Sequence, residues 1–438
     1  MDQFTFNSKL KTGLIGFMIL GLVCLGITFF TDDPLHSRFW SNYLHNTVFF
    51  TGIAFISIFV IAAFTTAYAG WYTVVKRIWE AYSLFLLPGL VLMLLIIAGV
   101  WGDFHHLYHW ADEEAVLSDH LLEAKSRFLN KGWYTFGTII IVGIWFFFAW
   151  KLRQLSLQED EQGTADFEFH RKIRIWSAAF LPIAAFSSAA VIWQWIMSID
   201  AHWYSTLFAW YATASWFVAA TALTILTIVF LKSRGYYENI THDHLHDLGK
   251  YMFAFSIFWT YLWFSQYMLI WYGNIGEETI YYRERLDNYR VLFYGNLLLN
   301  FVLPFFVLMR NDTKRKYGTL VFTSIAVFFG HWWDFFQMIK PGVYLTTQET
   351  LAHSHGAEVI DHAAEVGHGP VEEAAHAASH FAAGFTLPGL LEIGTMLGFL
   401  ALFMYVVFNR MEKAALLPKH DPYLQESLNH HVEPPYSE

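Results

Sequence analysis

Residues 82–102 read YSLFLLPGLVLMLLIIAGVWG, a stretch without a single charged side chain. A helix needs about 20 consecutive apolar residues to cross the hydrocarbon core of a bilayer. Comparable runs recur along the whole chain and predict ten membrane-spanning helices, at 10–30, 48–69, 82–102, 133–152, 173–198, 206–231, 250–272, 289–309, 317–339 and 384–408. The predicted fold class is all-α, a polytopic membrane helical bundle that forms one integral membrane domain over residues 1–438.

The composition supports the membrane class. Of the 438 residues, 55% are hydrophobic, 19% are aromatic and only 15% are charged. Soluble domains carry about 25% charged residues, so a chain of this composition does not suit a water-exposed surface. We therefore expect lipids around the chain and no nucleic-acid partner.

Cys24 is the only cysteine, and it lies inside the first apolar run. A disulfide within the chain, an iron–sulfur cluster and covalently attached c-type haem are therefore excluded. Nearly all of the 21 histidines fall in loops or at span ends, and His331 is read as the one exception near a span interior. We expect the chain to bind no redox cofactor and no metal.

The distribution of lysine and arginine predicts the orientation, because these residues accumulate in cytoplasmic loops. If the N-terminus is inside, 19 of the 27 lysines and arginines lie on the cytoplasmic side. Both termini are then cytoplasmic, including the tail 409–438. We expect no cleaved signal peptide, because Lys9 and Lys11 lead into a run long enough to span.

Three outer connections are long, at 103–132, 273–288 and 340–383. Such loops on one face favour docking of extramembrane subunits, and a solvated loop without a partner is the alternative. The last one is rich in histidine, at positions His353, His355, His362, His368, His376 and His380. These histidines lack compact ligand spacing, so a solvated periplasmic loop is favoured over a metal site.

Ionisable side chains are costly at membrane depth, so each is a functional candidate. The candidates for a proton pathway or quinone pocket are Asp103, His105, His106, Gln194, Asp200, His202, Gln266, His331, Asp334, Gln337, Glu392 and Glu80. His331, Asp334 and Gln337 are spaced to share one helical face. We expect the acidic and histidine residues at the outer ends to converge in one pocket. The alternative is that they are interfacial residues within an aromatic belt.

Two kinds of candidate have other readings as well. Gln194 and Gln266 lie deeper and are neutral, so hydrogen bonds between helices account for them, and a relay role is the alternative. Glu80 stands beside Arg77 at the inner start of a span. It is interpreted as half of an interfacial ion pair, and a proton entry point is the alternative.

Three segments resemble a known family. They are WQWIMSIDAHWYSTLF at 193–208, HDLGK at 246–250 and WTYLWFSQYMLIWY at 259–272. Together they resemble the F subunit of bacterial alternative complex III and, more distantly, the NrfD-like membrane subunits of polysulfide-reductase type. The likeness extends over essentially all ten predicted spans.

This resemblance implies a non-redox subunit of a respiratory quinol:cytochrome c oxidoreductase in the bacterial inner membrane. The implied partners are periplasmic iron–sulfur and multihaem cytochrome c subunits, which carry the clusters and haem c, and a paralogous membrane subunit that oxidises quinol. The implied role is a scaffold and candidate proton pathway, with quinone or menaquinone as the candidate ligand.

Two other functions stay open. The chain could itself be the quinol-oxidising paralogue, with an outer carboxylate or imidazole as proton acceptor. A stand-alone transporter is the second alternative, and it would show matched broken spans around a midplane site. Pro88, Pro182, Pro304 and Pro388 lie within or near spans, but they form no such matched pair.

Overall fold

The computed structural model describes residues 3–163, 167–354 and 382–432, and this part of the chain is helical without strands. Two isolated β-bridges join Gln3 to Ala415 and Ala383 to Leu387. The long helices are α1 (Ser8–Thr31), α2 (Ser37–Thr66), α4 (Leu86–Trp101), α7 (Lys131–Gln162), α8 (Glu168–Trp195), α9 (Thr206–Lys232), α10 (His242–Gly273), α15 (Tyr317–Ser354) and α17 (Leu390–Met411). The shorter ones are η1 (Trp71–Val74), α3 (Lys76–Ser83), η2 (His109–Ala111), α5 (Glu113–Ser118), α6 (His120–Lys125), η4 (Met197–Ile199), α11 (Gly276–Asp287), α12 (Arg290–Leu297), η5 (Leu298–Val302), α13 (Leu303–Leu308), α14 (Asn311–Arg315) and α18 (Leu424–Leu428).

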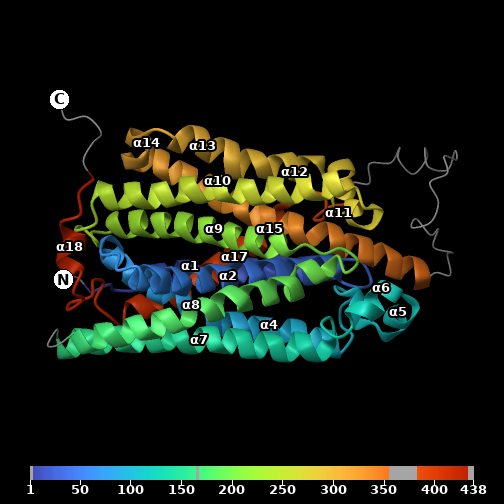
Figure 1. Cartoon of the computed structure of the whole chain (residues 1–438), viewed down its shortest axis with the longest axis horizontal. Coiled ribbons are helices and arrows are strands. Elements are labelled where there is room, and N and C mark those ends of the chain that lie inside the picture. The colour runs from blue at the N-terminus through green and yellow to red at the C-terminus, as the bar shows by residue number, and fades with distance from the viewer. Residues whose placement is uncertain (1–2, 164–166, 355–381, 433–438) are drawn as a thin grey trace.

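The long helices run side by side along the longest axis of the molecule (Figure 1). Helices α5, α6 and α11 lie at one end of this bundle, and α14 and α18 lie at the other (Figure 1). We call these the α11 end and the α18 end. The bridge between Gln3 and Ala415 brings the N-terminal segment beside the chain that follows α17.

Eight helical stretches are long and apolar enough to cross a membrane. They are 8–31, 37–66, 76–101, 131–162, 168–199, 206–232, 290–308 and 390–411. Helices α10 and α15 contain 32 and 38 residues and do not meet the same criterion, although both pack along α9. The described chain is therefore a helical membrane bundle with eight clear candidate spans.

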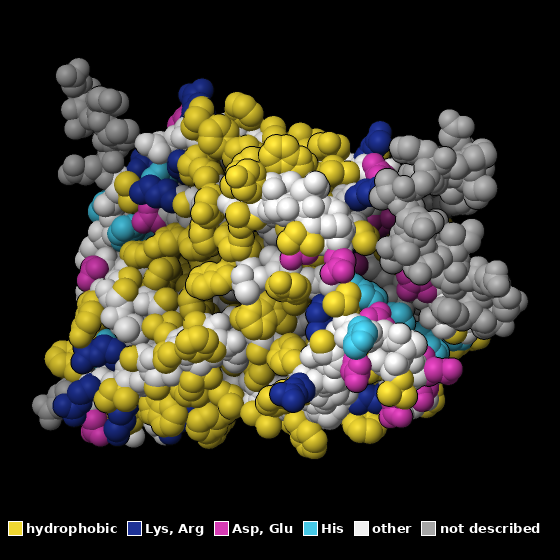
Figure 2. Space-filling model, turned by 45° about the vertical axis from the view of Figure 1, so that its right-hand side comes forward, with side chains coloured by type: hydrophobic (Ala, Val, Ile, Leu, Met, Phe, Trp, Pro, Cys, Tyr) yellow, Lys and Arg dark blue, Asp and Glu magenta, His cyan; other side chains and the backbone are white. Residues whose placement is uncertain are grey.

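The outer surface of the bundle matches a hydrocarbon environment. Figure 2 shows hydrophobic side chains gathered over the middle of one face, with most charged and histidine side chains toward its two ends. Large apolar side chains are strongly exposed, among them Phe30, Phe186 and Phe306. Water would penalise so much exposed apolar surface, and lipid tails do not.

Helix α2 lies inside the bundle, where 83% of its most apolar stretch is buried by other parts of the chain. It nevertheless carries Ser41, Asn42, His45 and Asn46, all at most 1% exposed. A helix that touches lipid could not hold these groups without cost, whereas a helix surrounded by protein can pair them with its neighbours. The central position of α2 therefore accounts for its polar residues.

Glycines let α1 and α17 approach closely. A Cβ atom at Gly21 would lie 2.6 Å from the Cα atom of Gly398, and a Cβ atom at Gly394 would lie 2.3 Å from the Sγ atom of Cys24. Small residues at helix contacts allow such backbone approach in membranes. Only 22% of the most apolar stretch of α1 is buried, so this contact with α17 is its main attachment.

Each of the three long outer connections that the sequence predicts contains helix, and α5 and α6 lie within 103–132. Residues 276–287 form α11, and α15 continues from the predicted span end at 339 to Ser354. The extension is held to α2, because the Thr347 hydroxyl donates to the Ser37 hydroxyl at 2.7 Å. Of the loop histidines, His353 lies in α15, and His355, His362, His368, His376 and His380 lie outside the described residues.

A layered stack fixes α11 to the α11 end. The rings of Trp203 and Tyr281 are 3.9 Å apart and nearly parallel, and the Arg285 guanidinium lies 3.4 Å from the centre of the Tyr281 ring. Arg285 also donates to Asp200 at 3.0 Å. This contact ties the segment before α9 to the segment before α12.

The chain after α17 packs against the α18 end over the described residues up to 432. Asp421 pairs with the buried Lys76 at 2.7 Å, and His244 bonds to the Ser427 carbonyl oxygen at 2.8 Å. These contacts join the C-terminal segment to the starts of α3 and α10. The sequence reading of 409–438 as a tail missed them because the partners lie far away along the chain.

Replacing Gly21 by alanine is expected to destabilise the protein by about 1–3 kcal/mol, because the new methyl group would overlap the backbone of α17. Gly16→Ala is the matched control on the same helix, since a Cβ atom there has nothing within 4 Å. Thermal unfolding in detergent should show a lower midpoint for Gly21→Ala only. Equal midpoints for the two variants would contradict the close contact.

Candidate functional site

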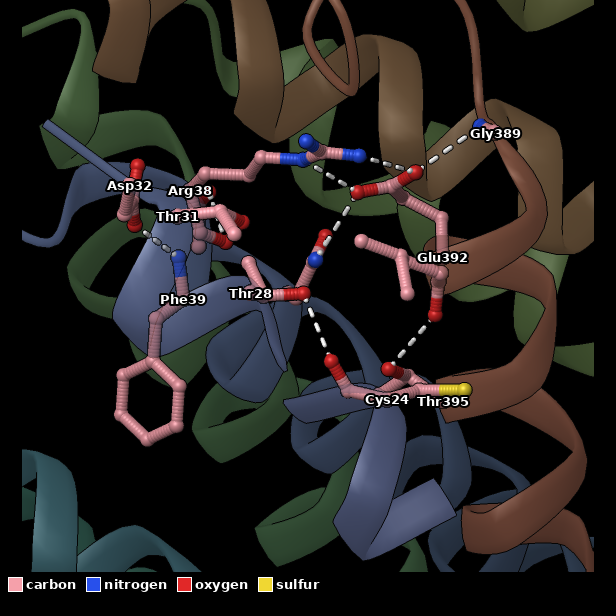
Figure 3. A network of polar contacts seen from close by, with 12 residues as sticks. Cys24, Thr28, Thr31, Asp32, Arg38, Phe39, Gly389, Glu392 and Thr395 are labelled. Carbon is pink, nitrogen blue, oxygen red and sulfur yellow. Dashed lines mark hydrogen bonds and ion pairs between the residues drawn. The ribbon is translucent and has the colours of Figure 1, made fainter. Parts of the chain in front are cut away.

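Glu392 is the centre of a buried ionic cluster near the α11 end. Arg38 donates to its carboxylate from Nε at 2.8 Å and from Nη2 at 3.0 Å (Figure 3). Asn42 Nδ2 donates at 3.0 Å, and the Gly389 N–H donates at 2.8 Å. Glu392 is 1% exposed and stands in the first turn of α17, where the helix dipole favours a negative charge. Its burial is therefore compensated by three donor residues.

Lys340 adds a second buried cation to this cluster. It is fully buried, and its ammonium group donates to the Ser41 hydroxyl at 2.7 Å. It also lies over the rings of Phe336 and Phe385, at 5.6 Å and 4.9 Å from their centres. A charge without water needs several such partners. We call Arg38, Ser41, Asn42, Lys340 and Glu392 the Glu392 cluster.

Asp32 lies beside this cluster, in the short connection between α1 and α2. Its carboxylate accepts the Phe39 N–H at 2.7 Å (Figure 3). Burial, reinforced by the neighbouring Asp33, raises the pKa of Asp32 to about 6, although the Phe39 hydrogen bond acts in the opposite direction. Asp32 is only partly buried, so its proton exchanges with the aqueous phase near neutral pH.

Asp334 is the centre of a second buried cluster, between α9, α10, α12 and α15. The Tyr211 hydroxyl donates to it, Asn296 Nδ2 donates at 2.6 Å and Trp259 Nε1 donates at 2.9 Å. Asn300 extends the network by donating to Asn296 Oδ1 at 2.6 Å. We call these five residues the Asp334 cluster. Both carboxylate oxygens of Asp334 accept hydrogen bonds, so this acid has its donors within the protein.

Histidines of α15 and α2 lie about one helical turn from members of the two clusters, His331 from Asp334 and His45 from Asn42. His331 is fully buried, and its Nδ1 is 2.9 Å from the Ser215 hydroxyl. His45 is also fully buried, and its Nε2 is 2.9 Å from the Trp332 carbonyl oxygen. The reading of His331 as the one histidine near a span interior is therefore wrong, because His45 lies inside α2. The sequence reading missed it because His45 falls just before the predicted start of that span at 48.

A third ionic cluster lies near the α18 end. Arg77 donates to Glu80 at 2.6 Å and also pairs with Asp160, and Arg153 lies 3.6 Å from Glu80. Glu80 and Arg77 are each 2% exposed. We call these four residues the Glu80 cluster. The ion pair that the sequence predicts between Glu80 and Arg77 is present, and it is buried rather than interfacial.

An aromatic layer separates the Glu80 cluster from the two others. Along α9, Tyr211 belongs to the Asp334 cluster, whereas Thr224 accepts the indole N–H of Trp79, which neighbours Glu80. Thirteen residues of helix between them correspond to about 20 Å. Within this interval the rings of Trp216 and Phe335 stack at 5.5 Å. Phe49, Phe55 and Trp145 add further ring contacts at this level.

The remaining predicted site residues belong to other local contacts. Asp200 bonds to Arg285, His202 pairs with Asp119, and Asp103 is exposed and lies 3.3 Å from Lys131. His106 is exposed, whereas His105 is buried and its Nε2 is 3.0 Å from the Ile96 carbonyl oxygen. Burial lowers the pKa of His105 to about 4, so it is neutral at pH 7. Gln194, Gln266 and Gln337 are buried.

The residues that the sequence places in one outer pocket bond to different partners in the structure. Among the described residues, Asp334 and Glu392 share no hydrogen-bond partner, and Asp103, Asp200 and His202 each bond elsewhere. The prediction assumed that span ends on one side converge, but each buried acid is instead satisfied by its nearest helices. Sequence reasoning missed Arg38, Lys340 and Tyr211, which looked like interfacial charges or an ordinary aromatic residue.

Comparison of the sequence with models of known protein families gives no match, and comparison with curated proteins gives none either.

Removing one partner of the Arg38–Glu392 pair is expected to cost about 3–5 kcal/mol, because it leaves a buried charge uncompensated. Arg38→Gln, Glu392→Gln and the double variant form a cycle in which the double variant should cost less than the sum of the single ones. Denaturant unfolding in detergent measures each value.

Lys131→Gln is the matched control, since Asp103 in that pair has a side chain that is 73% exposed. It should cost about 0–1 kcal/mol. Additive effects of Arg38→Gln and Glu392→Gln would show that the two residues do not stabilise each other.

Proposed function

We propose that this chain is an integral membrane subunit of a respiratory quinol:cytochrome c oxidoreductase of the alternative complex III type. In this role it is a scaffold for redox subunits and a candidate proton pathway, with no redox cofactor of its own. The proposal includes an NrfD-like bundle of ten spans, in which α10 and α15 also cross the bacterial inner membrane. It also places both termini and the α18 end in the cytoplasm.

The observation that carries the pathway is the pair of buried ionic regions on either side of the aromatic layer. Buried ionisable groups in a membrane protein are costly, and they commonly mark ion or proton routes. The Glu80 cluster serves one half of the bundle, and the Glu392 and Asp334 clusters serve the other. The aromatic layer between them prevents free leakage, so any transfer requires water or a side-chain movement in that interval.

Asp32 supports an exit on the α11 side. It is partly exposed, it adjoins the Glu392 cluster, and its pKa of about 6 permits proton exchange near neutral pH. Arg38 and Lys340 stabilise the negative charge of Glu392 when Asp32 is neutral as well as when it is ionised. This arrangement suits a proton that leaves or enters at the periplasmic surface.

The burial of Asp334 favours this role over quinol oxidation by the chain itself. A quinol hydroxyl group would have to reach a fully buried carboxylate that already accepts hydrogen bonds from Tyr211, Asn296 and Trp259. Each of these donors is held by packed helices. We therefore place the quinol, with quinone or menaquinone as its oxidised form, in the paralogous membrane subunit.

The α11 end supports docking of periplasmic subunits. The short helices α5 and α6 project a largely polar surface there, and Leu117 is 83% exposed among acidic residues. Iron–sulfur and multihaem cytochrome c subunits are the partners that we assign to this surface.

The orientation is testable by cysteine labelling in a Cys24→Ala background. A membrane-impermeant maleimide applied to intact spheroplasts should label Ser118→Cys on α5 and should not label Glu161→Cys at the end of α7. Both native side chains are exposed. The chain is expressed without the proposed periplasmic subunits, so that the membrane alone limits access. The reverse labelling pattern would place the α18 end outside.

The function is tested by purifying the native assembly through a tag on this chain. We expect co-purifying iron–sulfur and multihaem cytochrome c subunits, a haem c absorption band, and quinol:cytochrome c reductase activity. Recovery of the chain alone, or with transport of a solute in liposomes and no haem, would reject the proposal.

Within that assembly, the Asp334 cluster allows an exchange of acid and amide. Asp334→Asn alone removes the charge. It also places an amide NH2 group, which cannot accept hydrogen bonds, against the donors of the cluster. The double variant Asp334→Asn/Asn296→Asp keeps one carboxylate, which can accept hydrogen bonds from Asn300 and from the amide introduced at position 334. If a carboxylate here moves protons, the single variant should lower turnover about 10²-fold or more and should reduce the number of protons moved per electron, and the double variant should recover most of both. Full activity of an assembled Asp334→Asn variant would make the cluster purely structural.

A further inference from the structure

Three side chains that can bind metals meet at the α18 end, outside the clusters described above. Glu159 comes from the last turns of α7, His170 comes from the first turn of α8, and Asp421 comes from the C-terminal segment after α17. One candidate ligand atom from each of them lies within 4.8 Å of the other two. The fold therefore brings Asp421 beside Glu159 and His170. The last two flank the connection between α7 and α8, whereas Asp421 lies about 250 residues later.

Two of these groups are buried without a hydrogen-bond partner among the described residues. Glu159 is 3% exposed, and its Oε2 atom has no partner. The Nδ1 atom of His170 also has none, and it lies 3.7 Å from Glu159 Oε1. Buried polar atoms without partners are uncommon, so an unpartnered carboxylate oxygen and an unpartnered imidazole nitrogen on neighbouring side chains point to a shared ligand.

The charge of the cluster leaves room for a cation. Lys76 lies 2.7 Å from Asp421 and provides one positive charge against the two carboxylates. The nearby Arg77 is already shared by Glu80 and Asp160. With His170 neutral and both carboxylates ionised, as a bound cation would require, the group carries one net negative charge.

We propose that Glu159, His170 and Asp421 bind a divalent transition metal ion of the zinc type. Zinc takes imidazole nitrogen and carboxylate oxygen at about 2.0–2.2 Å, which places neighbouring ligand atoms about 3.4 Å apart in a tetrahedral site. The observed arrangement needs only small side-chain movements to reach that spacing. A water molecule would fill the fourth position. Imidazole with two carboxylates favours such an ion over calcium or magnesium.

The ion would fasten the C-terminal segment to the helix pair α7–α8. Asp421 already holds the backbone N–H of Tyr423 at 3.0 Å and the ammonium group of Lys76, so it is positioned before the metal arrives. Binding to the folded state alone stabilises that state. The segment around residues 419–432 should therefore open less often when metal is bound.

The test uses the full chain, purified in detergent, stripped with a chelator and then dialysed against zinc chloride. Mass spectrometry of the metal content should give one zinc equivalent more for the wild type than for Glu159→Gln or His170→Ala. Zinc held by the histidines of residues 353–380 is common to all three proteins, so it cancels in this difference. Glu161→Gln, an exposed neighbour on the same helix, should match the wild type.

A second measurement places the metal at the C-terminal segment. Trypsin cleaves after the exposed Lys419, and zinc should slow this cleavage roughly tenfold or more in the wild type and in Glu161→Gln. Zinc should not slow cleavage in Glu159→Gln. Equal zinc content in the wild type, Glu159→Gln and His170→Ala, each eluting as a single species, would overturn the proposal, and so would cleavage that ignores zinc in the wild type.

Discussion

A charged or polar group between packed helices in a hydrocarbon layer cannot hydrogen-bond to bulk water, so the protein itself must supply its hydrogen-bond and ionic partners. This constraint explains why Glu392 lies at the first turn of α17, within reach of Arg38, Asn42 and the Gly389 N–H. It also explains why the polar residues of α2 coincide with the helix that other helices enclose. Helices at the periphery, such as α1, present apolar side chains and glycines instead.

The same constraint shapes the proposed pathway. A fully satisfied carboxylate is stable but slow to exchange its proton, whereas a partly exposed one such as Asp32 exchanges readily. The structure provides both kinds near the α11 end, and it separates them from the Glu80 cluster by ring contacts among Trp216, Phe335 and their neighbours. A proton pathway needs the ionisable groups on either side of the aromatic layer. It also needs the layer itself, because without it protons would leak across the membrane.

The membrane class, the helical fold and most helix positions could be predicted because they depend on local apolar runs. The short or polar connections were harder, and α11 and the end of α15 were read as loops. Their helices depend on contacts such as Tyr281 with Trp203, which no local pattern reveals. The site was predicted only in part for the same reason. Asp334 and Glu392 were identified as unusual residues, but Arg38 is 354 positions from its partner, and a single sequence gives no sign of that pairing.

The distance in sequence between Arg38 and Glu392 also sets the delay between the synthesis of α2 and the synthesis of α17. Ribosomes add about 5–20 residues per second, so α2 enters the membrane roughly 20–70 s before α17 exists. During that interval Arg38 and Asn42 lack their carboxylate, and His45 and Asn46 lack α15. The early helices must therefore remain partly assembled until α15 and α17 are inserted. In that state the polar side of α2 faces the insertion machinery, neighbouring helices or the headgroup region. Among the described residues, the last candidate span to be made, α17, supplies the carboxylate that α2 needs.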